Sequence, residues 1–237
     1  MVEAEESEMV YLTGDKHGFF MRVFAFCDTV GSTTEDVLII LGDVCINYFG
    51  DEKDRAVKRL LEKLPVTLFC IHGNHEQRPE NPDYEETTRY GGAVYHEPVF
   101  PNLLFAKDGE IYEFAGKRCL VIGGAYSVDK PYRIAEGWGW WPDEQPSPEV
   151  RERVERRLDA EDWRVDVVLS HTCPLKYEPH EMFIGGVSQE NVDKSTEIWL
   201  DAIESGLEYG RWYCGHHHTD KTVDKLRFLY DDFIELR

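Results

Sequence analysis

The stretch Val66-Thr-Leu-Phe-Cys-Ile-His-Gly-Asn-His-Glu76 joins a short apolar run to a cluster of polar residues. Runs of four to eight residues that are rich in β-branched side chains and closed by turn residues are typical of buried strands. Four other runs, which begin at Val10, Val37, Val165 and Trp212, end in the same way. We therefore expect five strands whose carboxyl ends carry polar side chains.

Amphipathic segments lie between these runs and predict helices over residues 19–29, 53–64, 148–158 and 194–203. Ser147 before Pro148 is a typical helix start, an N-cap followed by proline at the first helical position. Strands that alternate with helices predict an α/β architecture. Residues 95–124, with turns at Asp108-Gly109 and Ala115-Gly116, and residues 222–236 predict antiparallel hairpins. Residues 77–92 and 126–147 lack periodicity and are expected to be loops.

The length of 237 residues suits one domain over residues 1–237, with residues 1–8 as a flexible acidic N-terminus. The 26 basic and 46 acidic residues give a net charge of -20. This charge repels phosphate backbones and anionic membranes, so we expect no binding to duplex nucleic acid or to a membrane. The acidic N-terminus lacks a secretory pattern, and the six cysteines form no CxxC pair. These features predict a cytoplasmic protein with free thiols, whose oligomeric state stays open.

The polar clusters at the predicted strand ends contain the carboxylate, imidazole and amide side chains that a catalytic metal site needs. They are Asp15, His17, Asp43, Asn74, His75, His171, His216 and His218. Open α/β sheets bind ligands beyond the carboxyl ends of their strands. A mixture of carboxylate, imidazole and amide oxygen suits divalent transition ions. We predict a site for divalent ions, Mn²⁺ foremost, with Fe, Zn and Ni as alternatives.

The ordered set Asp-x-His, Gly-Asp, Gly-Asn-His-Glu, His and Gly-His-x-His, over residues 14–218, resembles the signature of the calcineurin-like metallophosphoesterases. The resemblance implies a four-layer α/β sandwich of two mixed β-sheets flanked by α-helices. It implies that one metal binds Asp15, His17 and His218, that the other binds Asn74, His171 and His216, and that Asp43 bridges both. His75 would be the catalytic acid beside the phosphate. Strand alternation directs His217 away from the metals.

A centre of this kind predicts a phosphomonoesterase or phosphodiesterase that attacks a small-molecule or nucleotide substrate with a hydroxide held between the metals. A nuclease for single-stranded nucleic acid is an alternative that the acidic charge disfavours. A protein phosphatase is another, but Ile46 and Asn47 replace the second Asp and the phosphate-holding Arg of that branch. The chain is thus more similar to the bacterial and phage-type members. A non-catalytic interaction protein is disfavoured because every ligand position is intact.

Two residues are expected to contact the substrate. Asn47 stands where the protein phosphatase branch has its phosphate-binding Arg, and Arg133 in the 126–147 segment has a guanidinium suited to phosphate. A surface salt bridge is the other interpretation of Arg133. The tryptophans at positions 138, 140 and 141 predict either a lid over the cleft or a local cluster that pins the loop. His72 is expected to pack under the site, and His96 and His180 to be exposed.

Overall fold

The computed structural model describes residues 8–80 and 82–237, so residues 1–7 of the expected acidic N-terminus lie outside the described residues. Within these ranges the strands form a seven-stranded and a six-stranded sheet. The first sheet has the order β13-β1-β2-β3-β6-β5-β4. Its strands are β1 (Val10–Thr13), β2 (Val37–Ile40), β3 (Thr67–Cys70), β4 (Glu85–Arg89), β5 (Gly92–His96), β6 (Leu103–Ala106) and β13 (Ile234–Glu235).

The second sheet has the order β11-β12-β10-β9-β8-β7. Its strands are β7 (Ile111–Phe114), β8 (Lys117–Ile122), β9 (Val167–Ser170), β10 (Arg211–Cys214), β11 (Lys221–Val223) and β12 (Leu226–Phe228). Both sheets are mixed, with a parallel centre and antiparallel outer strands. In the first, β1, β2, β3 and β6 run parallel, and in the second β8, β9, β10 and β12 do.

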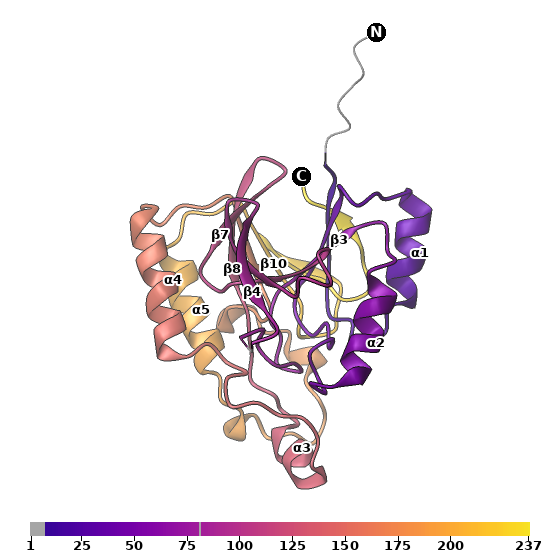
Figure 1. Cartoon of the computed structure of the whole chain (residues 1–237). Coiled ribbons are helices and arrows are strands. Elements are labelled where there is room, and N and C mark those ends of the chain that lie inside the picture. The colour runs from indigo at the N-terminus through magenta and orange to yellow at the C-terminus, as the bar shows by residue number, and fades with distance from the viewer. Residues whose placement is uncertain (1–7, 81) are drawn as a thin grey trace.

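The helices cover the outer faces of the two sheets, so the molecule has four layers (Figure 1). Helices α1 (Met21–Val30) and α2 (Glu52–Leu61) pack against the first sheet, and α4 (Pro148–Ala160) and α5 (Ser195–Gly206) against the second. The inner faces meet in a core that includes Leu12, Ile39, Phe69, Val121 and Leu169. Strands buried on both faces need apolar residues on both, which is why β2 is apolar throughout and β3 and β9 each have only one polar residue, at an end of the strand.

The predicted α/β sandwich is confirmed, as are the five strands and the four helices, with boundaries shifted by one to three residues. The predicted helix start is also present, because the Ser147 hydroxyl accepts a hydrogen bond from the backbone N–H of Val150 at 3.3 Å. No helix in the described ranges is long and apolar enough to cross a membrane.

Both segments predicted to be loops contain regular structure. Residues 85–89 form the edge strand β4, whose residues are mostly exposed and therefore show no apolar alternation. Residues Lys130–Glu136 form helix α3, which ends at Gly137 in the left-handed conformation, with φ of 69°. Tyr132 and Ile134 on α3 face outward while Arg133 is buried, so the helix lacks the apolar stripe that sequence periodicity detects.

One predicted turn has a different role. The chain around Asp108-Gly109 connects β6 to β7, and these two strands belong to different sheets. This turn therefore carries the chain from one layer to the other and does not close a hairpin. Two hairpins flank this turn. Strands β5 and β6 form the first, and β7 and β8, joined at Ala115-Gly116, form the second. In the tail, β11 and β12 form the expected hairpin.

Candidate metal centre and substrate pocket

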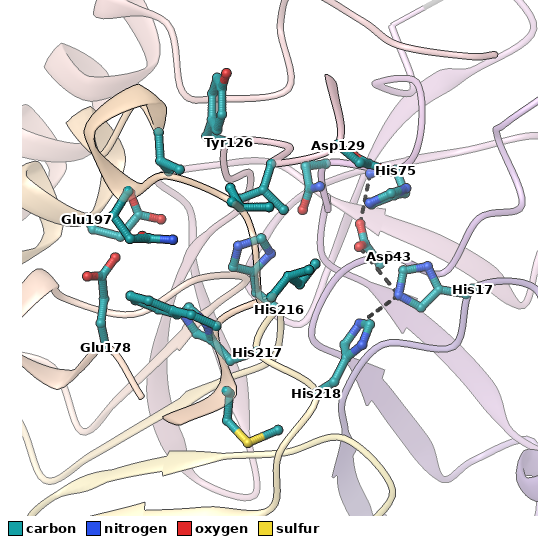
Figure 2. Close-up of a pocket in the computed structure, with 18 residues that line it drawn as sticks. His17, Asp43, His75, Tyr126, Asp129, Glu178, Glu197, His216, His217 and His218 are labelled. Carbon is teal, nitrogen blue, oxygen red and sulfur yellow. Dashed lines mark hydrogen bonds and ion pairs between the residues drawn. The ribbon is translucent and has the colours of Figure 1, made fainter. Parts of the chain in front are cut away.

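The predicted ligands come from five strands of the two sheets, and the edges where these parallel strands end meet at one side of the sandwich. His171 directly follows β9, and the other ligands follow β1, β2, β3 and β10 within two to five residues. Figure 2 shows His17, Asp43 and His75 gathered at one end of a pocket, with His216 and His218 beside them. The fold thus brings together residues that are far apart in the chain, with 201 positions between His17 and His218.

A first group of ligand atoms forms around Asp15. Its Oδ2 atom lies 3.2 Å from Nε2 of His218 and 3.8 Å from Nε2 of His17. The two imidazole nitrogens lie 2.9 Å from each other. Oδ2 of Asp15 is buried and makes no hydrogen bond with the part of the chain that the structure describes. Three ligand atoms converge here on one point.

A second group forms around His171, which is fully buried. Its Nε2 atom lies 2.8 Å from Oδ1 of Asn74 and 3.5 Å from Oδ1 of Asp43. The ring of His216 packs against the ring of His171, with centroids 5.0 Å apart. The other oxygen of Asp43 lies 3.7 Å from Nε2 of His17, so Asp43 touches both groups.

The backbone around these ligands adopts conformations that are rare for residues with a side chain. His17, Asp43, His216 and His218 have φ angles of 45°, 47°, 64° and 46°. Such residues cost roughly 1–3 kcal/mol each and cluster at functional sites, where the surrounding structure imposes them. Gly73 is needed for another reason, because a Cβ atom there would lie 2.1 Å from the backbone nitrogen of Asp43.

The electrostatics of the first group favour a bound cation. Burial raises the pKa of Asp15, but the neighbouring imidazoles of His17 and His218 outweigh it and hold that pKa well below its usual range. Burial lowers the pKa of His17, while contact with Asp15 and the charge of Asp43 raise it more strongly. Burial holds the pKa of His216 well below its usual range, so this ring is a neutral donor. The two carboxylates, four imidazoles and one amide oxygen, with an unsatisfied buried carboxylate oxygen among them, fit divalent transition ions.

His75 lies beside the ligand groups without belonging to either. Its backbone N–H donates to Oδ1 of Asp43 at 2.9 Å, and its ring centroid lies 5.2 Å from that of His17. Burial lowers the pKa of His75, and the charge of Asp43 opposes this. Figure 2 places Asp129 next to the His75 ring. His217 also lies outside both groups, with its Nε2 atom 3.5 Å from Sγ of Cys173.

Glu76 has a structural role that the sequence analysis missed. Its two carboxylate oxygens accept hydrogen bonds from the backbone N–H groups of Gly73 and Cys45, at 2.9 and 3.0 Å. It thereby ties the loop after β3 to the loop that carries Asp43. Burial and the charge of Asp43 raise the pKa of Glu76 to about 8. The sequence signal that could have indicated this role is the position of Glu76 directly after Asn74 and His75 in the motif.

The two residues expected to contact substrate do not line the pocket. The side-chain carbonyl oxygen of Asn47 accepts a hydrogen bond from the Tyr84 hydroxyl at 2.5 Å, and Asn47 lines a separate small polar cavity. The Arg133 side chain is 1% exposed and donates to the Ser127 hydroxyl at 3.1 Å and to the backbone oxygen of Asn74 at 3.4 Å. Arg133 therefore supports the loop that carries Asn74. Its guanidinium also lies 3.8 Å from Oδ1 of Asp129, so it forms an ion pair from a buried position.

The tryptophans of the 126–147 segment also lie outside the pocket lining. Trp141 packs on Tyr48, with centroids 5.3 Å apart, and the Trp140 indole donates to the carboxylate of Glu144. The segment contributes Tyr126, Val128 and Asp129 to the pocket. Of the other histidines, His72 is buried and His180 exposed as expected, whereas His96 is partly buried.

The pocket has a volume of about 320 Å³ and extends well beyond the ligand groups. Its second wall comes from the segment between β9 and α5, which the sequence analysis did not single out. The apolar members of this wall are Met182, Phe183, Ile184, Val187 and Val192. The run Met-Phe-Ile before Gly185-Gly186 was the available signal, since an apolar run in an irregular segment needs a partner surface.

Comparisons with known proteins identify one family. The sequence model for calcineurin-like phosphoesterases matches residues 9–231. The protein TT1561 of Thermus thermophilus is similar in structure, with 13% identity, 94% of this chain and 88% of that chain covered, and a TM-score of 0.53. The phosphopantetheinyl hydrolase of Mycobacterium tuberculosis is 16% identical, with 96% and 89% covered and a TM-score of 0.45. No curated protein matches the sequence at a significant level.

At 13% identity the likeness to TT1561 shows the fold alone, whereas the family match spans nearly all of the described residues. Its span includes every strand end that carries a predicted ligand. The chain belongs to the calcineurin-like phosphoesterase family and is a phosphoester hydrolase.

Proposed function

We propose that this chain hydrolyses a small organic phosphomonoester or phosphodiester with two divalent metal ions, Mn²⁺ foremost. Asp15, His17 and His218 would bind one ion, Asn74, His171 and His216 the other, and Asp43 both. The observation that carries this proposal is the position of Asp43, whose two oxygens lie 3.7 Å from His17 and 3.5 Å from His171.

The metal ions and His75 would have different tasks in this reaction. When bound, the two ions would lower the pKa of a water molecule and neutralise the charge on the phosphate. His75 stands at the edge of the ligand groups, where a leaving oxygen would emerge. Burial lowers its pKa, but a neutral imidazole still has one N–H group that can donate to that oxygen.

The shape and charge of the pocket support a small substrate. The pocket is enclosed on one side by the apolar wall of residues 182–192 and contains the carboxylates of Glu178 and Glu197. A nucleic acid strand would bring repeated phosphates past these acids and past a surface with a net charge of -20. Asn47 in its separate cavity offers no substitute for the arginine of the protein phosphatase branch.

The test is removal and return of the metals. Protein treated with a chelator should hydrolyse neither p-nitrophenyl phosphate nor its bis ester, and Mn²⁺ should restore activity while Ca²⁺ should restore little, because four imidazole ligands favour transition ions. Comparing the two esters separates monoesterase from diesterase activity. Circular dichroism of the stripped protein is the control for folding. Full activity in stripped, folded protein would refute the proposal.

A further inference from the structure

The pocket has a second polar end, remote from the metal ligands. Figure 2 shows Glu178 and Glu197 on the side opposite His17, Asp43 and His75. The carboxylate of Glu178 is already neutralised, since it accepts from the Lys194 ammonium at 2.6 Å. Glu197 has no such cation within hydrogen-bond distance among the described residues, and so the two acids differ.

Glu197 is the third residue of α5 and is only 5% exposed. One oxygen, Oε1, accepts a hydrogen bond from the Thr172 hydroxyl at 2.9 Å. The other, Oε2, is buried and has no hydrogen-bond partner in the described part of the chain. Buried polar atoms are nearly always paired, so this oxygen needs a donor that the described chain does not supply, and Glu197 belongs to the pocket lining. Burial raises the pKa of this carboxyl to about 7, and the hydrogen bond from Thr172 offsets only part of that effect.

Apart from these polar ends, much of the pocket lining is apolar. Met182, Phe183, Ile184 and Val192 form one wall, and Val128 belongs to the lining as well. Ile184 is 62% exposed and Met182 41%. Large apolar side chains that stay open to solvent along a pocket mark a surface for an apolar ligand.

Together these three regions describe a ligand with a phosphate at one end, an apolar middle and a hydrogen-bond donor at the other end. We propose that the substrate is a phosphoester of an aliphatic alcohol that carries an ammonium, amide N–H or hydroxyl group, and that Glu197 Oε2 accepts from this donor. This inference rests on the proposed phosphoesterase function and names its substrate class. A second phosphate at the remote end would face the carboxylates, so this class excludes nucleoside polyphosphates.

The experiment compares esters matched in chain length. Monophosphates of n-alkyl, ω-hydroxyalkyl and ω-aminoalkyl alcohols with two to eight carbons are assayed for kcat/KM. At one chain length we expect both donor esters to exceed the n-alkyl ester, the amino ester by about 10- to 100-fold, because a hydrogen bond to a charged group has that value. The preference should lie in KM, since Glu197 is remote from the reacting phosphorus.

Variants assign the preference to Glu197. Glu197→Leu should reduce the amino-to-alkyl ratio to about one, and Glu197→Gln, which keeps a carbonyl acceptor, should retain the hydroxyl preference while losing most of the amino preference. We compare the ratio of kcat/KM for the amino ester to kcat/KM for the alkyl ester, because a loss of activity that affects both esters equally leaves this ratio unchanged. Glu190→Gln, at an exposed residue of the same wall segment, is the matched control for loss of one charge and should keep the wild-type ratio.

The outcomes separate this inference from the proposed function. Two results would refute the role of Glu197 while leaving a phosphoesterase. One is an amino-to-alkyl ratio near one in the wild type at every chain length, and the other is a Glu197→Leu variant with the same ratio as the wild type. Titration calorimetry with the matching non-hydrolysable phosphonates makes the same comparison for binding alone. It therefore decides the role of Glu197 even for a protein that hydrolyses none of the esters, which would refute the proposed function.

Discussion

The Nε2 atoms of His17 and His218 lie 2.9 Å apart, although 201 residues separate them in the chain. At this distance the two ring nitrogens share a hydrogen bond, and the buried Oδ2 atom of Asp15 lies within 4 Å of both. Left empty, the arrangement keeps a desolvated carboxylate oxygen unsatisfied, which is costly. A divalent ion would satisfy all three atoms at once.

His218→Ala is therefore expected to lower the metal content from two ions per chain to about one. That ion would keep only Asp15, His17 and the shared Asp43 and should be lost during purification, while the second group is intact. Emission spectroscopy of the purified protein measures the content. His180→Ala removes an exposed histidine and should keep two ions. Two ions in His218→Ala would show that His218 is not a ligand.

Asp43→Asn should lower kcat/KM by more than about 100-fold, because residues that merely support a metal ligand already contribute ~10–100-fold. It should also lower metal content, since both ions lose a shared negative charge. Asp162→Asn is a close control, because Asp162 is exposed and has a φ of 51°, near the 47° of Asp43. An Asp43→Asn enzyme with two ions and near wild-type turnover would rule out a bridging role.

The residues predicted as ligands lie together in the structure because the sequence signals that mark them are local. A strand such as β3 is recognised from its own residues, and the carboxyl ends of parallel strands necessarily share an edge of the sheet. Edge strand β4 and helix α3 escaped prediction for the opposite reason. The residues of β4 are mostly exposed, and the buried residue of α3 is the polar Arg133. Neither pattern gives a periodic repeat of apolar residues.

The substrate contacts were harder to predict because they depend on where a side chain points. Asn47 occupies a recognisable position in the sequence motif, yet its amide turns toward Tyr84 in another cavity. Arg133 has the chemistry for phosphate, yet it lies beneath Asn74. The apolar wall around Phe183 follows from the path of an irregular segment, which tertiary packing decides.

His75→Asn should keep both metal ions and slow turnover by roughly 10²–10⁴-fold on an alkyl phosphate, the usual range for a general acid. The loss should be much smaller on p-nitrophenyl phosphate, whose leaving group departs without a proton. Steady-state rates on the two esters, with metal content measured alongside, provide the check. An equal loss on both esters would contradict proton donation by His75.

Ser127→Ala should weaken metal binding at the second group by about 10- to 100-fold, the usual effect of removing a partner that orients a ligand. The Ser127 hydroxyl accepts from the side-chain amide of Asn74 at 2.9 Å and so directs Oδ1 of Asn74 toward His171. Activity as a function of Mn²⁺ concentration measures the effect, and excess Mn²⁺ should restore the rate. Ser188→Ala, at an exposed serine, should bind as wild type. Unchanged Mn²⁺ dependence in Ser127→Ala would exclude an orienting role.

Glu197→Gln should change how stability depends on pH. Burial raises the pKa of Glu197 from 4.5 to about 7. Below pH 4.5 the carboxyl is protonated in both states, so its contribution to stability is fully present. As the pH rises from 4.5 to 7 the unfolded chain ionises first, and the wild type loses up to ~3 kcal/mol of unfolding free energy. Gln does not titrate, so urea denaturation should show the variant gaining on the wild type between pH 5 and 7.5, under identical metal conditions. Glu190→Gln should differ from wild type by a constant amount over this range, and parallel curves for Glu197→Gln would mean that its carboxyl keeps an ordinary pKa.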